Sequence, residues 1–209
     1  MARPNPRALG LRLGAAIPLL LSFGVVGCTG PSREDATDGV IRMCSSCHGP
    51  EGRSVSPIVP RLAGQQEDYL VIQLRAFRDR TRADSHPHAY MWGIAERLTD
   101  AEVERLAAYY STRAPAPGER ADPTDMAAGK KIYDEGIQDH DIPKCAACHG
   151  DHAQGIDDVP RLAGQHRSYI AEQLAAFGSN VRPDESMHGN ARNLTESQIR
   201  ALAAYLSSE

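Results

Sequence analysis

Residues Cys145-Ala146-Ala147-Cys148-His149 form one of two copies of a short pattern, and the earlier copy is Cys44-Ser45-Ser46-Cys47-His48. Both copies fit the C-x-x-C-H pattern that attaches a c-type haem. On a helical turn, residues at i, i+3 and i+4 lie on one face, so two thiols can bond the porphyrin while the next imidazole reaches the iron. A C-x-x-C pair also serves zinc sites and redox dithiols. Two copies followed by the same downstream residues favour haem, and they predict two haem c groups.

A longer repeat extends downstream of each motif. Pro60-Arg61-Leu62-Ala63-Gly64-Gln65 recurs as Pro160-Arg161-Leu162-Ala163-Gly164-Gln165, and further matches follow at nearly the same spacing. Self-similarity of this kind indicates that one structural unit has been duplicated. The later matched pairs are Tyr69 and Tyr169, Gln73 and Gln173, Phe77 and Phe177, Arg82 and Arg182, Met91 and Met187, and Tyr109 and Tyr205.

The pattern of apolar residues predicts helices in both units. The stretch from Gln65 to about Arg78 has a mostly buried side. Thr99-Asp100-Ala101-Glu102 and Thr195-Glu196-Ser197-Gln198 each fit the capping box that begins a helix. No convincing alternating strand is present. We therefore expect an all-α fold with two tandem domains, residues 38–113 and 126–209, joined by a proline-rich linker at residues 114–125.

The N-terminal residues are typical of an export signal. Three arginines precede an apolar run from Leu13 to Val26 that Pro18 interrupts and that is short for a membrane span. Val25-Val26-Gly27-Cys28 also resembles the lipobox of bacterial lipoproteins, in which the cysteine is acylated and becomes the mature N-terminus. That resemblance implies a signal peptide at residues 1–27, lipid attachment at Cys28 and a flexible tether at residues 28–37, with the protein anchored to a membrane. The alternatives are ordinary cleavage that leaves a free thiol, or an uncleaved anchor.

The charge balance excludes one class of partner. Without the signal, the chain carries 20 basic and 27 acidic side chains, and most of the acidic excess lies in residues 119–209. Nucleic acid is therefore not expected to bind. An acidic surface instead suits a basic docking face on a protein partner. The alternative is a solvated surface that only aids solubility.

The two C-x-x-C-H motifs, the Pro-Arg-Leu-Ala-Gly-Gln blocks, the late methionines and a final helix with Leu-Ala-Ala-Tyr make residues 38–209 similar to the dihaem cytochromes c4. Each half resembles a small class I cytochrome c wrapped around one haem. The resemblance implies a periplasmic electron carrier, not an enzyme, with two His/Met-ligated haems. It also implies quinol:cytochrome c oxidoreductase as the electron donor and a terminal oxidase as the acceptor.

Two other functions stay open. The first is the haem subunit of a dehydrogenase complex such as flavocytochrome c sulfide dehydrogenase, whose cytochrome subunit has a similar dihaem build. The second is a dihaem peroxidase, which is an enzyme and needs one accessible iron. If both irons hold protein ligands on both faces, no position is open for a substrate.

The candidate iron ligands are a histidine and a methionine in each half. His48 and His149 are the proximal ligands by their place in the motifs. Met91 and Met187 are matched by the repeat and lie far enough downstream to cross over the haem, and methionine sulfur suits haem iron. Nearby histidines are rivals for the sixth position, namely His86, His88 and His188.

The repeated Pro-Arg block supplies candidates that support the haems. Pro60 and Pro160 resemble the family's proline whose backbone carbonyl orients the proximal imidazole. Arg61 and Arg161 are then candidates for charge-assisted bonds to haem propionates. The prolines could instead mark plain helix-start turns, and the arginines could be solvated charges. Weaker candidates for the propionate role are Arg82 and Arg182, while Gln65 and Gln165 either bond across the domain interface or open a helix.

Overall fold

The computed structural model describes residues 1–2, 33–83 and 88–209. The predicted signal peptide, the lipid-attachment residue Cys28 and the rival ligand His86 lie outside the described residues. Within them, two isolated β-bridges occur, between Ile137 and Ile142 and between Ile156 and Val159, and no strand forms. The prediction of an all-α fold is confirmed.

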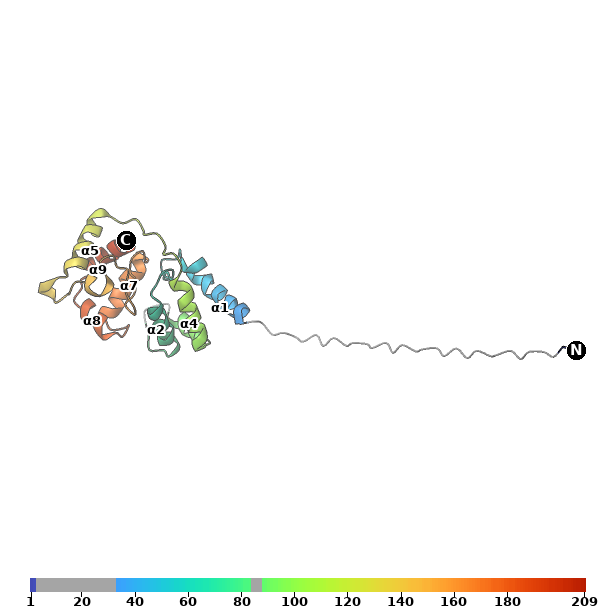
Figure 1. Ribbon diagram of the computed structural model, residues 1–209. Helices are drawn as coiled ribbons and strands as arrows, with labels where there is room; N and C mark the ends of the chain where they lie inside the picture. The colour runs from blue at the N-terminus through green and yellow to red at the C-terminus, as the bar shows by residue number, and fades with distance from the viewer. Residues whose placement is uncertain (3–32, 84–87) are drawn as a thin grey trace. The chain divides into compact units, whose positions relative to one another are not determined.

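The helices follow one another in two similar sets (Figure 1). No helix in the described part of the chain is long and apolar enough to cross a bilayer. The first set is α1 (Arg33–His48), α2 (Glu67–Arg78), α3 (His88–Ala95) and α4 (Asp100–Ser111), with a short 3-10 helix at Pro50–Gly52. The second set is α5 (Pro123–Glu135), α6 (Ala146–His149), α7 (Arg167–Gly178), α8 (Glu185–Ala191) and α9 (Glu196–Ser208), with a 3-10 helix at Gln138–His140.

Helix α1 is longer than the sequence suggested. It begins at Arg33, inside the segment 28–37 that was expected to be a flexible tether. That segment is polar and lacks an apolar pattern, but arginine, glutamate and alanine have high intrinsic helix propensity. The helix that carries the first haem motif therefore extends N-terminally through residues 33–37, which the sequence analysis assigned to the tether.

Each half has its own hydrophobic core, because each set of helices packs its apolar faces against one another. Removing apolar surface from water stabilises the folded state by about 25 cal/mol per Å². In the first half α2 packs on α4, and in the second half α5 and α7 both pack on α9 (Figure 1). The first core contains Leu70, Leu98, Val103, Leu106, Ala107 and Tyr110. The second core contains Tyr133, Ala153, Ala163, Ile170, Leu202, Ala203, Tyr205 and Leu206.

Both predicted capping boxes are present. The Thr99 hydroxyl accepts a hydrogen bond from the Glu102 N–H, and the Glu102 carboxylate accepts one from the Thr99 N–H at 2.8 Å. Thr195 and Gln198 make the same pair of bonds at the start of α9. These bonds satisfy backbone donors that an isolated helix start leaves open, and they fix where α4 and α9 begin.

Helices α5 and α9 approach each other closely at a glycine. A Cβ atom on Gly129 would overlap the carbonyl oxygen of Ala201 and lie 2.8 Å from Cβ of Tyr205. Gly39 of α1 has more room, because its nearest neighbour would be a side-chain nitrogen of Arg42 at 3.9 Å. The helix that leads toward the second haem motif is therefore packed more tightly than the helix that carries the first.

Candidate functional site

Both C-x-x-C-H motifs end a helix at their histidine. The first motif occupies the end of α1, and the second occupies Cys145 and α6. In each motif the first thiol is half-buried and the second, Cys47 or Cys148, is exposed. None of these four sulfurs is in a disulfide, so each is available to bond a haem. The two thiols and the imidazole of each motif thus lie on one helical turn, as the spacing predicts.

The half-buried thiols do not resemble those of a redox dithiol. Burial raises the pKa of the Cys145 thiol to about 11, and burial also raises the pKa of Cys44. Both groups are therefore neutral near pH 7, whereas reactive C-x-x-C cysteines have a lowered pKa next to cationic groups. The described residues also bring together no group of three or more His, Cys, Asp or Glu side chains that could hold a metal ion.

Each motif histidine is held by a prolyl carbonyl. His48 Nδ1 lies 2.8 Å from the carbonyl oxygen of Pro60, and His149 Nδ1 lies 3.0 Å from that of Pro160. A carbonyl can only accept, so the proton is on Nδ1 and the lone pair is on Nε2. Burial lowers the pKa of both histidines, although the bond to proline opposes the shift. Each motif therefore presents a neutral, oriented imidazole, which is the form that binds a metal.

The two matched methionines occupy equivalent helices. Met91 lies on α3, which packs on α2, and Met187 lies on α8, which packs on α7. The Asp184 side chain caps α8 by accepting a hydrogen bond from the Met187 N–H at 2.8 Å. The rival ligand His188 has its Nδ1 2.9 Å from the Phe177 carbonyl oxygen.

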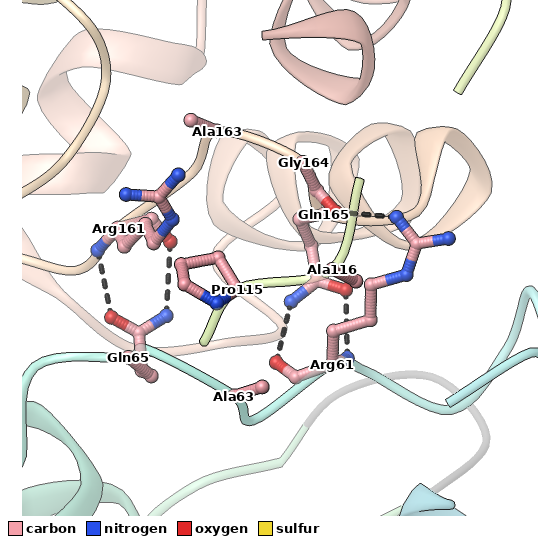
Figure 2. Close-up of a pocket in the computed structure, with 9 residues that line it drawn as sticks. All are labelled: Arg61, Ala63, Gln65, Pro115, Ala116, Arg161, Ala163, Gly164 and Gln165. Carbon is pink, nitrogen blue, oxygen red and sulfur yellow. Dashed lines mark hydrogen bonds between the residues drawn. The ribbon is translucent and has the colours of Figure 1, made fainter. Parts of the chain in front are cut away.

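A pair of glutamines joins the two halves (Figure 2). Gln65 donates to the Arg161 carbonyl at 2.9 Å and accepts from the Arg161 N–H at 2.7 Å. Gln165 makes the same two bonds to the backbone of Arg61, each at 2.9 Å. Both glutamines are buried. Of the two roles left open by the sequence, these side chains perform the interdomain one.

The matched arginines of the Pro-Arg blocks have different surroundings. The Arg61 guanidinium donates to the carbonyls of Gly164 and Pro117 and pairs with Glu119 at 3.5 Å. In Figure 2 the Arg161 guanidinium points away from Gln65, and its buried Nε has no hydrogen-bond partner within residues 33–83 and 88–209. Burial lowers the pKa of Arg161. The Arg61 guanidinium is therefore bonded within the interface, whereas the Arg161 guanidinium can still donate hydrogen bonds to an anion.

A second polar cluster is buried between the halves, and it contains the two arginines that the sequence ranked lowest. Arg82 donates to Tyr169 at 3.0 Å and to Gln173 at 3.2 Å. Arg182 donates to Tyr69 at 2.9 Å and to Gln73 at 2.8 Å. Arg82 and Arg182 are only 6% and 5% exposed. Each arginine of one half thus bonds the tyrosine and glutamine of the other.

The charge of this cluster fits a bound anion. The recorded partners of Arg182 are neutral oxygens, and the described residues include no carboxylate in an ion pair with it. A guanidinium this deeply buried is costly unless an anion compensates it. Haem propionates would supply that charge, so Arg182 and the oriented imidazoles both fit haem.

The sequence analysis noticed the tyrosines and glutamines of this cluster only as repeat matches. Tyr69, Gln73, Tyr169 and Gln173 lie on α2 and α7 among apolar neighbours. Burial raises the pKa of Tyr169 above its ordinary value. The sequence did contain a signal for this cluster, namely polar residues repeated on an otherwise buried helix face. Such residues indicate a buried hydrogen-bond network, because buried polar groups need partners.

Comparison with known proteins gives a consistent result. The Cytochrome c family model matches residues 40–113 and 126–209. The solved cytochrome c4 structure of Acidithiobacillus ferrooxidans is 40% identical, with a TM-score of 0.76, over 79% of this chain and 98% of that one. Cytochrome c-552 of Acidithiobacillus ferridurans is 39% identical over 91% of this chain and 84% of its own length. The thiosulfate dehydrogenase electron acceptor of Thiomonas intermedia is 34% identical over 90% of this chain and 88% of its own length.

The family match covers both halves of the chain, and each half contains one haem motif with its proline-held histidine. The structural neighbour spans the two halves together, which a single-domain cytochrome could not do. The chain therefore belongs to the cytochrome c family, as a dihaem cytochrome c4 whose tandem domains carry two covalently bound haem c groups.

Proposed function

We propose that this protein is a periplasmic carrier of single electrons between redox proteins, and that it performs no catalysis of its own. The observation that carries the proposal is the pair of buried, neutral imidazoles, each oriented by a prolyl carbonyl. Such a ligand holds an iron on one face, and a methionine on the opposite face would leave no position for a substrate. Haem iron then supplies one reversibly held electron per domain.

The residues proposed to hold the haems are those that the repeat matches. Cys44 and Cys47 attach the first haem, and Cys145 and Cys148 attach the second. His48 and His149 are the proximal ligands, and Met91 and Met187 fill the sixth positions. Arg161 and the buried arginines Arg82 and Arg182 compensate the propionate charge, while Arg61 acts mainly at the interface. The domains are residues 38–113 and 126–209, with a linker at residues 114–125.

The proposed partners are other electron-transfer proteins. Quinol:cytochrome c oxidoreductase as donor and a terminal oxidase as acceptor are one pair. A dehydrogenase is a second candidate donor, and the relative named as a thiosulfate dehydrogenase electron acceptor favours it. A stable complex with a flavoprotein, as in flavocytochrome c sulfide dehydrogenase, would make the chain a haem subunit instead.

The proposed location is the periplasmic side of a membrane. Residues 1–27 act as a lipoprotein-type signal peptide, and Cys28 carries the lipid. One acyl chain holds a protein only marginally, and several hold it firmly. Confinement to the membrane surface raises the effective concentration of membrane partners. Mass spectrometry of the mature N-terminus tests this directly, since an unmodified Cys28 or an intact signal would contradict it.

The haem assignment is tested by counting haems per polypeptide. The wild-type protein is expected to hold two, and the double variants Cys44→Ser/Cys47→Ser and Cys145→Ser/Cys148→Ser are expected to hold one each. Two haems in either variant would overturn the attachment sites.

The carrier role is tested by adding cyanide and hydrogen peroxide to the resting ferric protein. Wild type is expected to stay low-spin and unreactive, because both iron faces are occupied. Met91→Ala and Met187→Ala are each expected to open one haem to cyanide, and they serve as positive controls. A wild-type protein that binds cyanide readily or consumes peroxide would favour the peroxidase alternative.

A further inference from the structure

The linker between the halves carries a buried charged contact. His166, which directly precedes α7, is 3% exposed. Its Nε2 lies 3.0 Å from the carbonyl oxygen of Ser54 in the first half. Its Nδ1 lies 2.6 Å from a carboxylate oxygen of Glu119 in the linker. One imidazole therefore touches the first half and the linker while it belongs to the second half.

The partners of this imidazole define its protonation. The Ser54 carbonyl can only accept, so Nε2 must carry a proton. The Glu119 carboxylate also faces the Arg61 guanidinium at 3.5 Å and the Arg167 N–H at 3.4 Å, and both of these groups donate. A carboxylate whose two oxygens both face donors is an ionised acceptor, so the Nδ1 atom of His166 must carry a proton as well. The contact is complete only when His166 is an imidazolium and Glu119 a carboxylate.

The matched position in the first half makes the neutral version of this contact. Gln66 donates from Nε2 to the Gln154 carbonyl of the second half at 2.8 Å. His166 and Gln66 thus reach across the interface in the same way. An amide does not titrate in the range of pH where imidazole does. The two contacts across the interface are therefore similar, except that the contact of His166 depends on the protonation of its ring.

Other charged groups near the contact are mostly cations. Arg53 of the first half donates to the Ala114 carbonyl and pairs with Glu51. Arg113, the last residue of the first half, donates to the Tyr109 carbonyl, and in the linker the Arg120 carbonyl accepts from the Arg167 side chain. The backbone of Glu119 is fixed by its N–H, which donates to the Ser207 carbonyl near the terminal Glu209. The arginine that pairs with the Glu119 carboxylate is none of these but Arg61 of the first half.

We propose that His166 and Glu119 form a proton-operated latch that ties the first half, the linker and the second half together. The latch is closed while His166 is protonated and Glu119 is ionised. When His166 loses a proton, a nitrogen lone pair faces an acceptor oxygen, and one bond becomes a repulsion. When Glu119 gains a proton, its contacts with Arg61 and His166 lose their charge. The interface therefore loosens on both sides of an intermediate pH range.

The first test reads the protonation state directly. Ring nitrogens of the full-length, fully reduced holoprotein labelled with 15N-histidine are followed by NMR, and the His166 signals are identified by their loss in His166→Gln. Both ring nitrogens of His166 are expected to be protonated while the latch is closed. A neutral ring throughout the pH range in which the protein is folded would overturn the proposal, and the variant is needed only to assign the signals.

The second test measures opening of the interface by amide hydrogen exchange. The reporters are two N–H groups outside the second half that donate to it: that of Glu119, to the Ser207 carbonyl, and that of Arg61, to the Gln165 side chain. The exchange rate of wild type relative to His166→Gln, compared at equal pH, is expected to rise roughly tenfold as His166 deprotonates. Glu119→Gln is expected to remove the acid-side rise, and Gln66→Ala is the matched control with no effect on pH dependence. A wild-type to His166→Gln ratio that does not change with pH would show that the contact is only structural.

Discussion

The two halves of this chain come from one repeat, yet they are tied into the molecule differently. Contacts between matched residues are symmetric, since Gln65 bonds the backbone of Arg161 as Gln165 bonds that of Arg61. Contacts of the linker are not symmetric, because the chain passes between the halves once. Glu119 pairs with Arg61 and His166, and the described residues place no carboxylate in an ion pair with Arg161.

This difference shows where duplicated domains become distinct. Where repeated residues of one half contact repeated residues of the other, the same contact forms twice. Arg82 and Arg182 therefore have equivalent partners. Residues that meet a single-copy segment face different requirements. The second half also holds its leading helix more closely than the first, through the α5–α9 contact at Gly129. Three pairs of variants and one capping-box variant test how much free energy these differences carry.

The largest effect is expected at the helix crossing. Gly129→Ala places a methyl group against the Ala201 carbonyl, a backbone atom that cannot rotate away, so α5 and α9 must separate. We expect a loss of about 3 kcal/mol in the free energy of unfolding. Gly39→Ala, with free space around it, is expected to be neutral or to stabilise by up to about 1 kcal/mol through helix propensity. Guanidinium titration of the holoproteins measures both, and equal losses would show that the two helices are held alike.

The paired arginines come next. Arg61→Met removes hydrogen bonds to the Gly164 and Pro117 carbonyls and the ion pair with Glu119, and we expect a cost of about 2 kcal/mol. Arg161→Met is expected to change the free energy of unfolding by less than about 0.5 kcal/mol, since the buried Nε has no partner to lose. Its effect should appear instead in the reduction potential of the second haem. A large loss of stability from Arg161→Met would place the two arginines in one structural role.

The buried tyrosines of the two cores differ in hydrogen bonding. The Tyr133 hydroxyl donates to the Gly150 carbonyl next to His149, whereas the buried Tyr110 hydroxyl has only the Cys44 and Ser45 side chains near it and makes no well-formed hydrogen bond with the described residues. Tyr133→Phe is expected to cost about 1 kcal/mol. Tyr110→Phe is expected to be neutral or slightly stabilising, because it removes an unsatisfied polar group. Thermal unfolding of both variants beside wild type decides the point, and a destabilised Tyr110→Phe would contradict it.

The smallest effect concerns pH and the two capping boxes. The backbone N–H and the hydroxyl of Thr99 lower the pKa of Glu102 below its ordinary value of 4.5. A lowered pKa in the folded state stabilises the protein above the unfolded pKa, and this contribution is lost as the pH falls through the folded pKa. The box of α9 uses Gln198 and has no such dependence. Acidification should therefore loosen the first turn of α4 relative to that of α9 by a few tenths of a kcal/mol.

Amide exchange at Val103 and Ile199, the next backbone donors to each N-cap, measures this difference. Glu102→Gln is the matched variant, since it gives the first half the cap of the second. It should make the two helix starts respond to pH in the same way. Persistence of the difference in that variant would place its origin outside the cap.

Short-range spacing in the sequence was enough to predict much of this molecule. Two thiols and an imidazole within five residues define a haem motif wherever the chain places it. The helical class and both capping boxes follow from patterns of similarly local range, because helix geometry relates residues three and four apart. The duplication follows from the recurrence of these local patterns about a hundred residues downstream. The extent of α1 was missed for a local reason too, since a polar segment with good helix formers shows no apolar period.

The interface was decided only in three dimensions. The bonds of Gln65, Arg82 and His166 join residues that lie about a hundred positions from their partners or in the linker, and no spacing rule connects them. Identical sequence at Arg61 and Arg161 gave identical expectations, while their environments differ because one faces Glu119. What a repeat specifies is the domain and its cofactor. The packing of the two copies around one linker decides which polar groups contact one another. Because these groups are buried, each of them needs its hydrogen-bond partner.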